Sequence, residues 1–235
     1  MRATSRRHTK KRETMKKETV ILFDLDGTLI DSTEAILESF AQAFERFETT
    51  VPEPGAITAM IGEPLSVMFS KLGVHETQID EYVAAYKAHY RRISREKTHL
   101  LPGAREAVEL ASSFARLGVV TTKTGRYAVE LLEHLGLMPY FEVLIGSEDV
   151  IRHKPHPEPV LKALRLMDAE GDRAWMIGDT PMDIEAAFAA GIEPCGVCCG
   201  YADERELRRG CERVFPTALA AVTWLASKEE IESLL

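Results

Sequence analysis

The sequence predicts an α/β fold in which a parallel sheet is interrupted by a helical insertion. Short apolar runs alternate with amphipathic helical stretches, which is typical of β-α units, and one long interval lacks a strand pattern. Strands are expected at residues 20–24, 118–122, 142–146, 174–179, 193–198 and 213–215. Helices are expected between them at residues 104–117, 127–135, 158–167, 182–190 and 217–227. Glycine directly follows several of these helices, as expected at helix ends: Gly118, Gly136 and Gly191.

The interval without a strand pattern runs from Ser32 to about Leu100. Its apolar side chains repeat at helical spacing in successive stripes: Ile36, Phe40, Phe44 and Phe47; Leu65, Met68, Phe69 and Leu72; and Ile79, Tyr82, Val83, Tyr86, Tyr90 and Ile93. We therefore interpret residues 33–99 as a helical cap inserted after the first strand. Residues 19–32 and 100–235 then form the sheet-containing core, and the cap is expected to act as a lid over the strand ends.

The charge of the chain is unevenly distributed. Residues 1–18 hold eight Lys or Arg against two Glu, although the 235 residues together carry a formal net charge of −8. We expect a disordered basic tail at residues 1–18. The acidic remainder argues against nucleic-acid binding, which depends on basic surface. No apolar run approaches the roughly 20 residues of a membrane span. Without a secretory signal, we expect a cytoplasmic protein with no nucleic-acid or membrane partner.

Polar side chains that suit phosphate chemistry follow the expected strands. Ligands of open α/β sheets bind beyond the carboxyl ends of the strands, so these side chains are expected to converge on one rim. They are Asp24, Asp26, Gly27 and Thr28; Thr121, Thr122 and Lys123; Lys154; and Asp179 and Asp183. Clustered carboxylates repel one another unless a cation compensates, and Mg²⁺ prefers carboxylate, phosphate and water oxygens. The pattern predicts a phosphate held between Mg²⁺ and Lys154.

These segments match the motifs of a known family. The runs DLDGT, TTK, KPHPEP and GDTPMD, in this order, closely resemble the haloacid dehalogenase superfamily of phosphohydrolases. The insertion after the first motif is similar to the cap of its phosphoglycolate-phosphatase and β-phosphoglucomutase branch. The resemblance covers roughly residues 19–228. It implies a Rossmann-like parallel sheet core with an inserted, mobile α-helical cap domain.

The resemblance also implies roles for the residues at the rim. Asp24 corresponds to the nucleophile that forms an aspartyl-phosphate, and Asp26 to the general acid and base. The implied phosphate-binding groups are Thr121, Thr122 through its backbone N–H, Lys154 and Gly27. The implied metal ligands are Asp24, Asp26, Asp179 and Asp183.

Two assignments stay open at this point. Thr180 and Asp183 are also spaced as an N-cap and the acid three residues on, with a proline at the first helical position, so Asp183 can cap a helix, support a metal or do both. Lys123 competes with Lys154 for the phosphate. The Lys-Pro context favours Lys154 and leaves Lys123 peripheral. His153 and His156 are expected to be polar loop residues rather than metal ligands.

The implied activity is Mg²⁺-dependent hydrolysis of a small, phosphoglycolate-like phosphomonoester, with a small phosphorylated metabolite as partner. The loop MIGEPLS, residues 60–66, is expected to contact the substrate beyond its phosphate. Alternatives within the family are a pyrophosphatase and a sugar phosphomutase; a non-catalytic binding protein is a further alternative, against which the paired acids argue. Arginines of the insertion are expected on solvated helix faces: Arg46, Arg91, Arg92 and Arg95. The chain is expected to be a monomer or homodimer.

Overall fold

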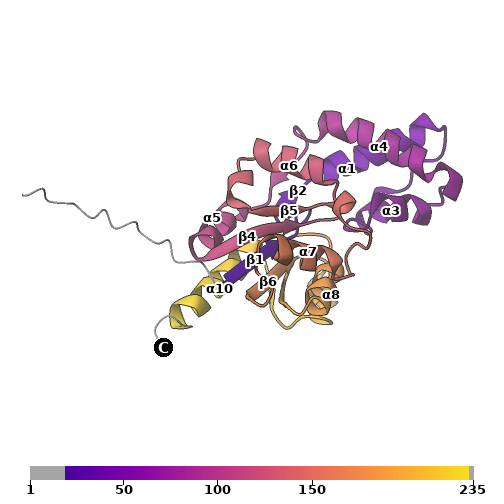
Figure 1. Cartoon of the computed structure of the whole chain (residues 1–235). Helices are drawn as coiled ribbons and strands as arrows, with labels where there is room; N and C mark the ends of the chain where they lie inside the picture. Colours follow the sequence, from indigo (N-terminus) through magenta and orange to yellow (C-terminus); the bar gives the residue numbers. More distant parts are fainter. Residues whose placement is uncertain (1–18, 233–235) are drawn as a thin grey trace, which may run out of the picture.

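A computed structural model describes residues 19–232 of the chain (Figure 1). Within these residues, a six-stranded parallel sheet has the order β5–β4–β1–β6–β7–β8. Its strands are β1 (Thr19–Phe23), β4 (Ala115–Val120), β5 (Val143–Ile145), β6 (Arg173–Gly178), β7 (Glu193–Val197) and β8 (Val214–Phe215). The predicted α/β fold with a parallel sheet is therefore confirmed. The predicted basic tail at residues 1–18 lies outside the described residues.

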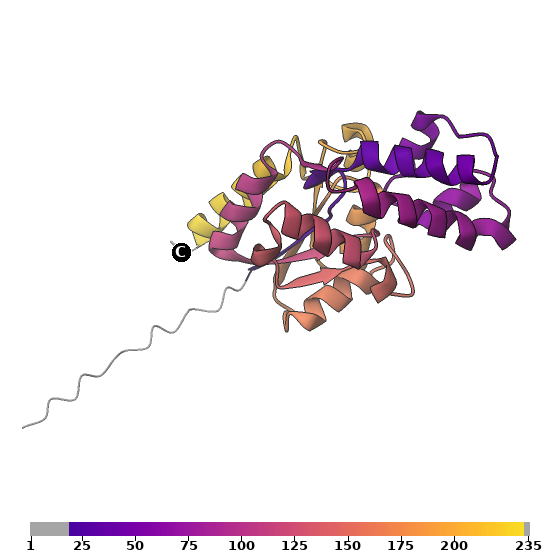
Figure 2. The same cartoon turned by 90° about the horizontal axis from the view of Figure 1, so that it is seen from above.

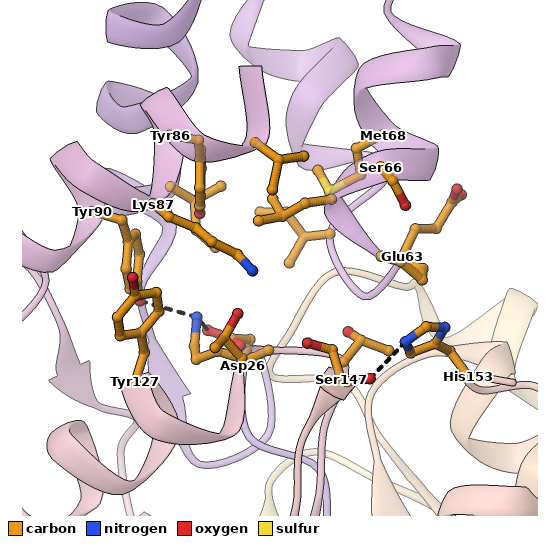
Figure 3. A pocket seen from close by; sticks show the side chains of 18 of the residues that line it. Asp26, Glu63, Ser66, Met68, Tyr86, Lys87, Tyr90, Tyr127, Ser147 and His153 are labelled. Atoms are coloured by element: carbon orange, nitrogen blue, oxygen red, sulfur yellow. Dashed lines mark hydrogen bonds and ion pairs between the residues drawn. The ribbon is translucent and has the colours of Figure 1, made fainter. Parts of the chain in front are cut away.

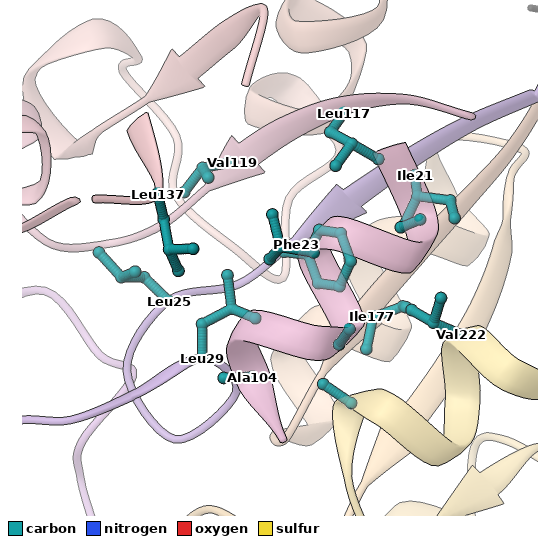
Figure 4. Close-up of a cluster of buried hydrophobic side chains, with 14 of the residues drawn as sticks. Ile21, Phe23, Leu25, Leu29, Ala104, Leu117, Val119, Leu137, Ile177 and Val222 are labelled. Atoms are coloured by element: carbon teal, nitrogen blue, oxygen red, sulfur yellow. The ribbon is translucent and has the colours of Figure 1, made fainter. Parts of the chain in front are cut away.

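Helices cover both faces of this sheet because its strands alternate buried side chains between the two faces. In β1, Ile21 and Phe23 pack on one face, and Val20 and Leu22 on the other. The first face is covered by α5 (Ala104–Phe114), α6 (Gly125–His134) and α10 (Ala218–Glu232). The second face is covered by α7 (Glu158–Leu166) and α8 (Pro181–Ala189). Phe23 lies at the centre of the first face (Figure 4).

The insertion forms a helical body beside the sheet (Figure 2). It consists of α1 (Thr33–Arg46), α2 (Pro54–Thr58), α3 (Leu65–Lys71) and α4 (Ile79–Ile93), with a 3₁₀ turn η1 (Glu76–Gln78). Its own aromatic core is centred on Phe69, whose ring contacts those of Phe40 and Tyr86. Its arginines are exposed, as expected: Arg46, Arg91, Arg92 and Arg95.

A two-stranded antiparallel sheet joins this helical body to the core. It pairs β2 (Ile30–Asp31) with β3 (His99–Leu100), so the chain leaves the core and returns to it at adjacent positions. The sequence did not predict these strands, because two residues are too few to show an alternating pattern. The remaining short elements are η2 (Met138–Tyr140), η3 (Ser147–Asp149) and α9 (Glu204–Arg208).

Two predicted helix ends are wrong, one of them at residue 227, where the helix continues to Glu232 as α10. The helix expected to run to Leu117 and to end at Gly118 stops at Phe114, and Gly118 lies inside β4. Ala115 is already extended, with φ −123° and ψ 160°, and it pairs with Thr19 of β1. Pairing with the central strand therefore takes these residues out of the helix, although their apolar spacing also fits helical periodicity.

Among residues 19–232, none of the helices combines the length and the apolar character that spanning a bilayer demands.

Candidate active site

The candidate site lies at the carboxyl end of the sheet, beside the central strand β1, where the strand order switches from one side of the sheet to the other. β1 is flanked by β4 on one side and by β6 on the other. Asp24 follows β1 directly, and Asp179 follows β6 directly. Such a switch in strand order opens a crevice beyond the strand ends, which is where open α/β sheets bind their ligands.

Three buried acids meet at this crevice in the described part of the chain. Asp24, Asp179 and Asp183 each offer a carboxylate oxygen, and these oxygens all lie within 4.8 Å of one another. The ammonium of Lys154 lies 2.8 Å from Asp24 and 2.5 Å from Asp183. It also donates a hydrogen bond of 3.1 Å to the carbonyl oxygen of Val120. The structure thus brings four of the sequence-predicted residues together.

Asp183 performs helix capping and faces this cluster at the same time. Its Oδ2 accepts hydrogen bonds from the backbone N–H of Thr180 at 3.0 Å and from the Thr180 hydroxyl at 2.7 Å. This is the capping box at the start of α8. Its Oδ1 accepts from Lys154. The carboxylate is therefore held by the helix terminus on one side and by the cluster on the other.

Asp179 is held in one orientation by hydrogen bonds and close backbone contacts. The Thr28 hydroxyl donates to its Oδ1 at 3.0 Å, and the backbone N–H of Tyr201 donates to its Oδ2 at 2.9 Å. A Cβ atom added to Gly27 would lie 2.3 Å from Oδ2, and one added to Gly200 would lie 2.1 Å from it. Gly27 also has a φ of +83°, which favours glycine. Both glycines therefore make room for this carboxylate, and Thr28 supports it.

The electrostatics of the cluster favour an additional cation. Burial is the largest cause and raises the pKa of Asp24 to about 7 although the neighbouring Lys154 acts to lower it; the charges of Asp183 and Asp26 add smaller increases. Burial, followed by the charges of Asp24 and Asp183, raises the pKa of Asp179. For Lys154, burial acts to lower the pKa, but Asp183 and Asp24 raise it overall. A buried set of carboxylate oxygens with one ammonium is acidic, and it fits a hard divalent cation.

Asp26 faces a different set of partners. Its carboxylate accepts a hydrogen bond from the Ser32 hydroxyl and lies 3.0 Å from the Lys123 ammonium. It is outside the cluster of Asp24, Asp179 and Asp183, so the geometry does not support metal binding by its side chain, and that assignment stays a prediction.

Lys123 is not peripheral, contrary to the sequence-based expectation. Its side chain is 8% exposed, donates a hydrogen bond of 3.0 Å to the Tyr90 hydroxyl and lies 4.6 Å from the centre of that ring. Burial acts to lower the pKa of Lys123, but the charge of Asp26 and the contact with Tyr90 raise it overall. The position of Lys123 directly after a predicted strand could have indicated that it lies at the rim. Its contacts with Asp26 and Tyr90 could not be predicted, because both residues are far from Lys123 in the sequence.

The threonines before Lys123 have separate contacts. Thr121 is buried, and its hydroxyl accepts a hydrogen bond of 3.1 Å from the backbone N–H of Lys123. The Thr122 hydroxyl donates a hydrogen bond of 2.8 Å to the carbonyl oxygen of Gly62 in the cap. This contact engages the Thr122 hydroxyl, and phosphate binding by the Thr122 backbone N–H stays a prediction. The loop after β4 therefore contacts the cap both through Thr122 and through Lys123.

The predicted polar loop residues His153 and His156 bond to nearby backbone. His153 Nε2 lies 3.0 Å from the carbonyl oxygen of Ser147, and His156 Nδ1 accepts from the N–H of Glu158 at 3.1 Å. Neither belongs to the acidic cluster.

A cavity of about 290 Å³ lies between the cap and this rim (Figure 3). Asp26 and Lys123 line it from the core. The cap contributes residues 61–66, which belong to the loop expected to contact the substrate, together with side chains of α1, α3 and α4. The cavity can thus accommodate a small ligand beside Asp26 and Lys123.

A profile of haloacid dehalogenase-like hydrolases matches residues 21–197, which is most of the chain and includes the strands that carry Asp24 and Asp179. The chain belongs to the haloacid dehalogenase-like hydrolase family. This confirms the family that the four motifs indicated.

Named relatives of this family member are phosphatases. The chain is 33% identical over 183 residues to a phosphoglycolate phosphatase of Aquifex aeolicus, covering 77% of this chain and 85% of that one. It is 34% identical over 183 residues to the pyrophosphatase PpaX of Halalkalibacterium halodurans, covering 77% and 83%. A haloacid dehalogenase-like family hydrolase from Streptococcus pneumoniae superposes with a TM-score of 0.80 at 27% identity, covering 88% of this chain and 98% of that one.

Proposed function

We propose that this chain is a Mg²⁺-dependent phosphatase that hydrolyses a small phosphomonoester through an aspartyl-phosphate at Asp24. The observation that carries the proposal is the position of Asp24. Its buried carboxylate lies at a strand end, 2.8 Å from the Lys154 ammonium and beside two further acids. A nucleophile next to fixed positive charge is suited to attack on an anionic phosphoryl group.

In the first half-reaction, a carboxylate oxygen of Asp24 forms a bond to phosphorus as the bond from phosphorus to the leaving alcohol oxygen breaks. Asp26 donates a proton to that oxygen, and Lys154 neutralises charge on the transferring phosphoryl group. Ser32 and Lys123 hold the carboxylate of Asp26 in place for this transfer. The cap excludes bulk water while the phosphoryl group moves.

In the second half-reaction, Asp26 removes a proton from a water molecule, whose oxygen attacks phosphorus and releases Asp24. Two acids are needed because one is esterified and cannot move protons at that stage. Asp24, Asp179 and Asp183 are the side chains proposed to hold Mg²⁺, with Asp183 also capping α8. The bound ion supplies positive charge that favours an ionised Asp24 and neutralises phosphoryl oxygens.

Phosphoglycolate-like monoesters are the first candidate substrates, and pyrophosphate is the second. Similarity to a named phosphoglycolate phosphatase supports the first, and similarity to the pyrophosphatase PpaX supports the second. The cavity beyond the rim favours the monoester, because its cap side provides apolar side chains such as Ile61 and Met68 for a carbon-containing leaving group.

The test is release of phosphate from 4-nitrophenyl phosphate and phosphoglycolate with Mg²⁺ present. Asp24→Asn should lower kcat by at least about a thousandfold, the size of loss expected when a reacting group is removed. The matched control is Asp168→Asn, an exposed position with a positive φ that asparagine accepts, and it should keep the wild-type rate. Equal rates for Asp24→Asn and the wild type would reject the assigned nucleophile.

A further inference from the structure

Lys87 of helix α4 extends into the cavity from the cap, opposite Asp26 (Figure 3). Its side chain is half-buried. Among residues 19–232, the structure records no hydrogen bond or ion pair for its ammonium group, whereas Lys123 across the cavity contacts Asp26 and Tyr90. Lys87 is therefore a cation in a partly enclosed space that lacks a counter-charge of its own.

The acidic groups around the cavity already have other partners. Glu63 forms an ion pair of 2.7 Å with Lys71, and Glu148 accepts a hydrogen bond of 2.8 Å from the backbone N–H of Gly125 at the start of α6. Asp26 is paired with Lys123. Asp80 also lines the cavity, but it is exposed and precedes Lys87 by nearly two helical turns, roughly 10 Å along α4. The charge of Lys87 is thus available to a ligand.

The space between Lys87 and the core is mostly apolar. Ile36, Ile61, Met68, Val83 and Tyr86 contribute to its lining. At roughly 30 Å³ for each water molecule, a cavity of about 290 Å³ has room for a leaving group much larger than glycolate. A bare polyol would leave these apolar side chains without complementary contacts, while an aryl or alkyl skeleton would bury them.

We propose that the leaving group of the substrate carries a carboxylate on an apolar or aromatic skeleton, and that Lys87 binds this carboxylate. The inference rests on the proposed phosphatase function and specifies its substrate class. The phosphate occupies the rim near Asp24 and Lys154, the skeleton packs against the apolar cap residues, and the second anion pairs with Lys87. Lys87 is a specificity-determining residue in this assignment and takes no part in bond breaking.

The test compares phenyl phosphate with 3-carboxyphenyl and 4-carboxyphenyl phosphate. The wild type should have a higher kcat/KM for at least one carboxylated ester than for phenyl phosphate. Lys87→Met keeps the apolar part of the side chain and removes the charge. It should lower the ratio of kcat/KM, carboxylated over uncarboxylated, by roughly tenfold, which is the usual worth of a hydrogen bond to a charged group. Lys87→Arg should retain the preference.

Arg91→Met is the matched control, because Arg91 lies one turn further along α4 on an exposed position outside the cavity. Arg91→Met should leave the ratio of kcat/KM, carboxylated over uncarboxylated ester, unchanged. If the wild type shows no preference, or if Lys87→Met lowers kcat/KM equally for all esters, the inference about Lys87 is wrong while the phosphatase function stands. If no ester is hydrolysed in an Asp24-dependent manner, the proposed function is rejected together with this inference.

Discussion

Asp24, Asp179 and Asp183 bury their carboxylates close together, with Lys154 paired to Asp24 and Asp183, and this arrangement makes folding depend on pH. The pKa of Asp24 rises from 3.8 to about 7, first because of burial, and burial also raises the pKa of Asp179. At a pH between 3.8 and about 7, the Asp24 carboxyl is protonated in the folded chain but has already lost its proton in the unfolded chain. By linkage, the free energy of unfolding then falls as the pH rises.

We therefore expect the metal-free protein to lose stability between about pH 4 and pH 7. Urea unfolding in the presence of EDTA at several pH values measures this slope. Asp24→Asn cannot ionise and should flatten the slope, which separates the contribution of Asp24 from that of other carboxylates. A slope equally steep in the variant and in the wild type would show that Asp24 does not carry a raised pKa.

Individual residues differ in how far the sequence predicted them. The acids and Lys154 could be predicted because each follows an apolar run or lies in a distinctive local motif. The burial of Lys123 could not, because it depends on Asp26 and on Tyr90 from a separate helix. The Gly200 contact with Asp179 was equally hidden, since nothing beside Gly200 in the sequence indicates that a carboxylate lies against it.

At the scale of elements, the local apolar pattern predicted the strands well where all residues of a strand are buried. It failed where helical and strand spacing of the apolar residues overlap. Residues 115–117 fit both a helix and a strand, and pairing of Ala115 with Thr19 decides for the strand. β2 and β3 stabilise one another across 67 intervening residues of cap, a contact that has no local signature. The loop after β4 likewise contacts the cap through Thr122 and Lys123, and these contacts have no local signature in the sequence.

The contact between this loop and the cap yields a prediction. Thr122→Val keeps the shape of the side chain but removes the hydrogen bond to the Gly62 carbonyl oxygen. The arrangement in which the cap contacts the loop after β4 should be less populated. KM should then rise by about fivefold, the effect of one net hydrogen bond. Steady-state kinetics with 4-nitrophenyl phosphate measures it.

Thr58→Val is the control, since the Thr58 hydroxyl donates to the Pro54 carbonyl oxygen inside the cap and does not bridge to the core. It should leave KM near the wild-type value. An unchanged KM in Thr122→Val would contradict a role of this bond in cap closure.

At the scale of the whole molecule, the chain contains separate packing units. The buried apolar residues of the cap cluster around Phe40, Phe69 and Tyr86, apart from the clusters on the two faces of the sheet. Units that bury their own apolar residues can open independently. The cap is therefore expected to unfold locally without loss of the sheet.

Phe69→Ala should destabilise the cap by about 3–5 kcal/mol, the usual cost of truncating a buried phenylalanine. Amide hydrogen exchange should show faster exchange in α1, α3 and α4 and little change in β1, β4 and β6. Phe188→Ala provides the control, because Phe188 is 56% exposed on α8. This substitution should change amide exchange neither in the cap helices nor in the strands. Equal loss of protection in cap and sheet would show that they unfold as one unit.

The paired strands β2 and β3 hold the points of departure and return of the cap side by side. An insertion whose two covalent connections to the core lie side by side is modular: a different insertion can replace it without shifting the register of any strand in the sheet. The carboxylates that we propose for catalysis stay on the core whichever insertion is attached. Preference for a leaving group and capacity for phosphoryl transfer can therefore diverge independently during evolution.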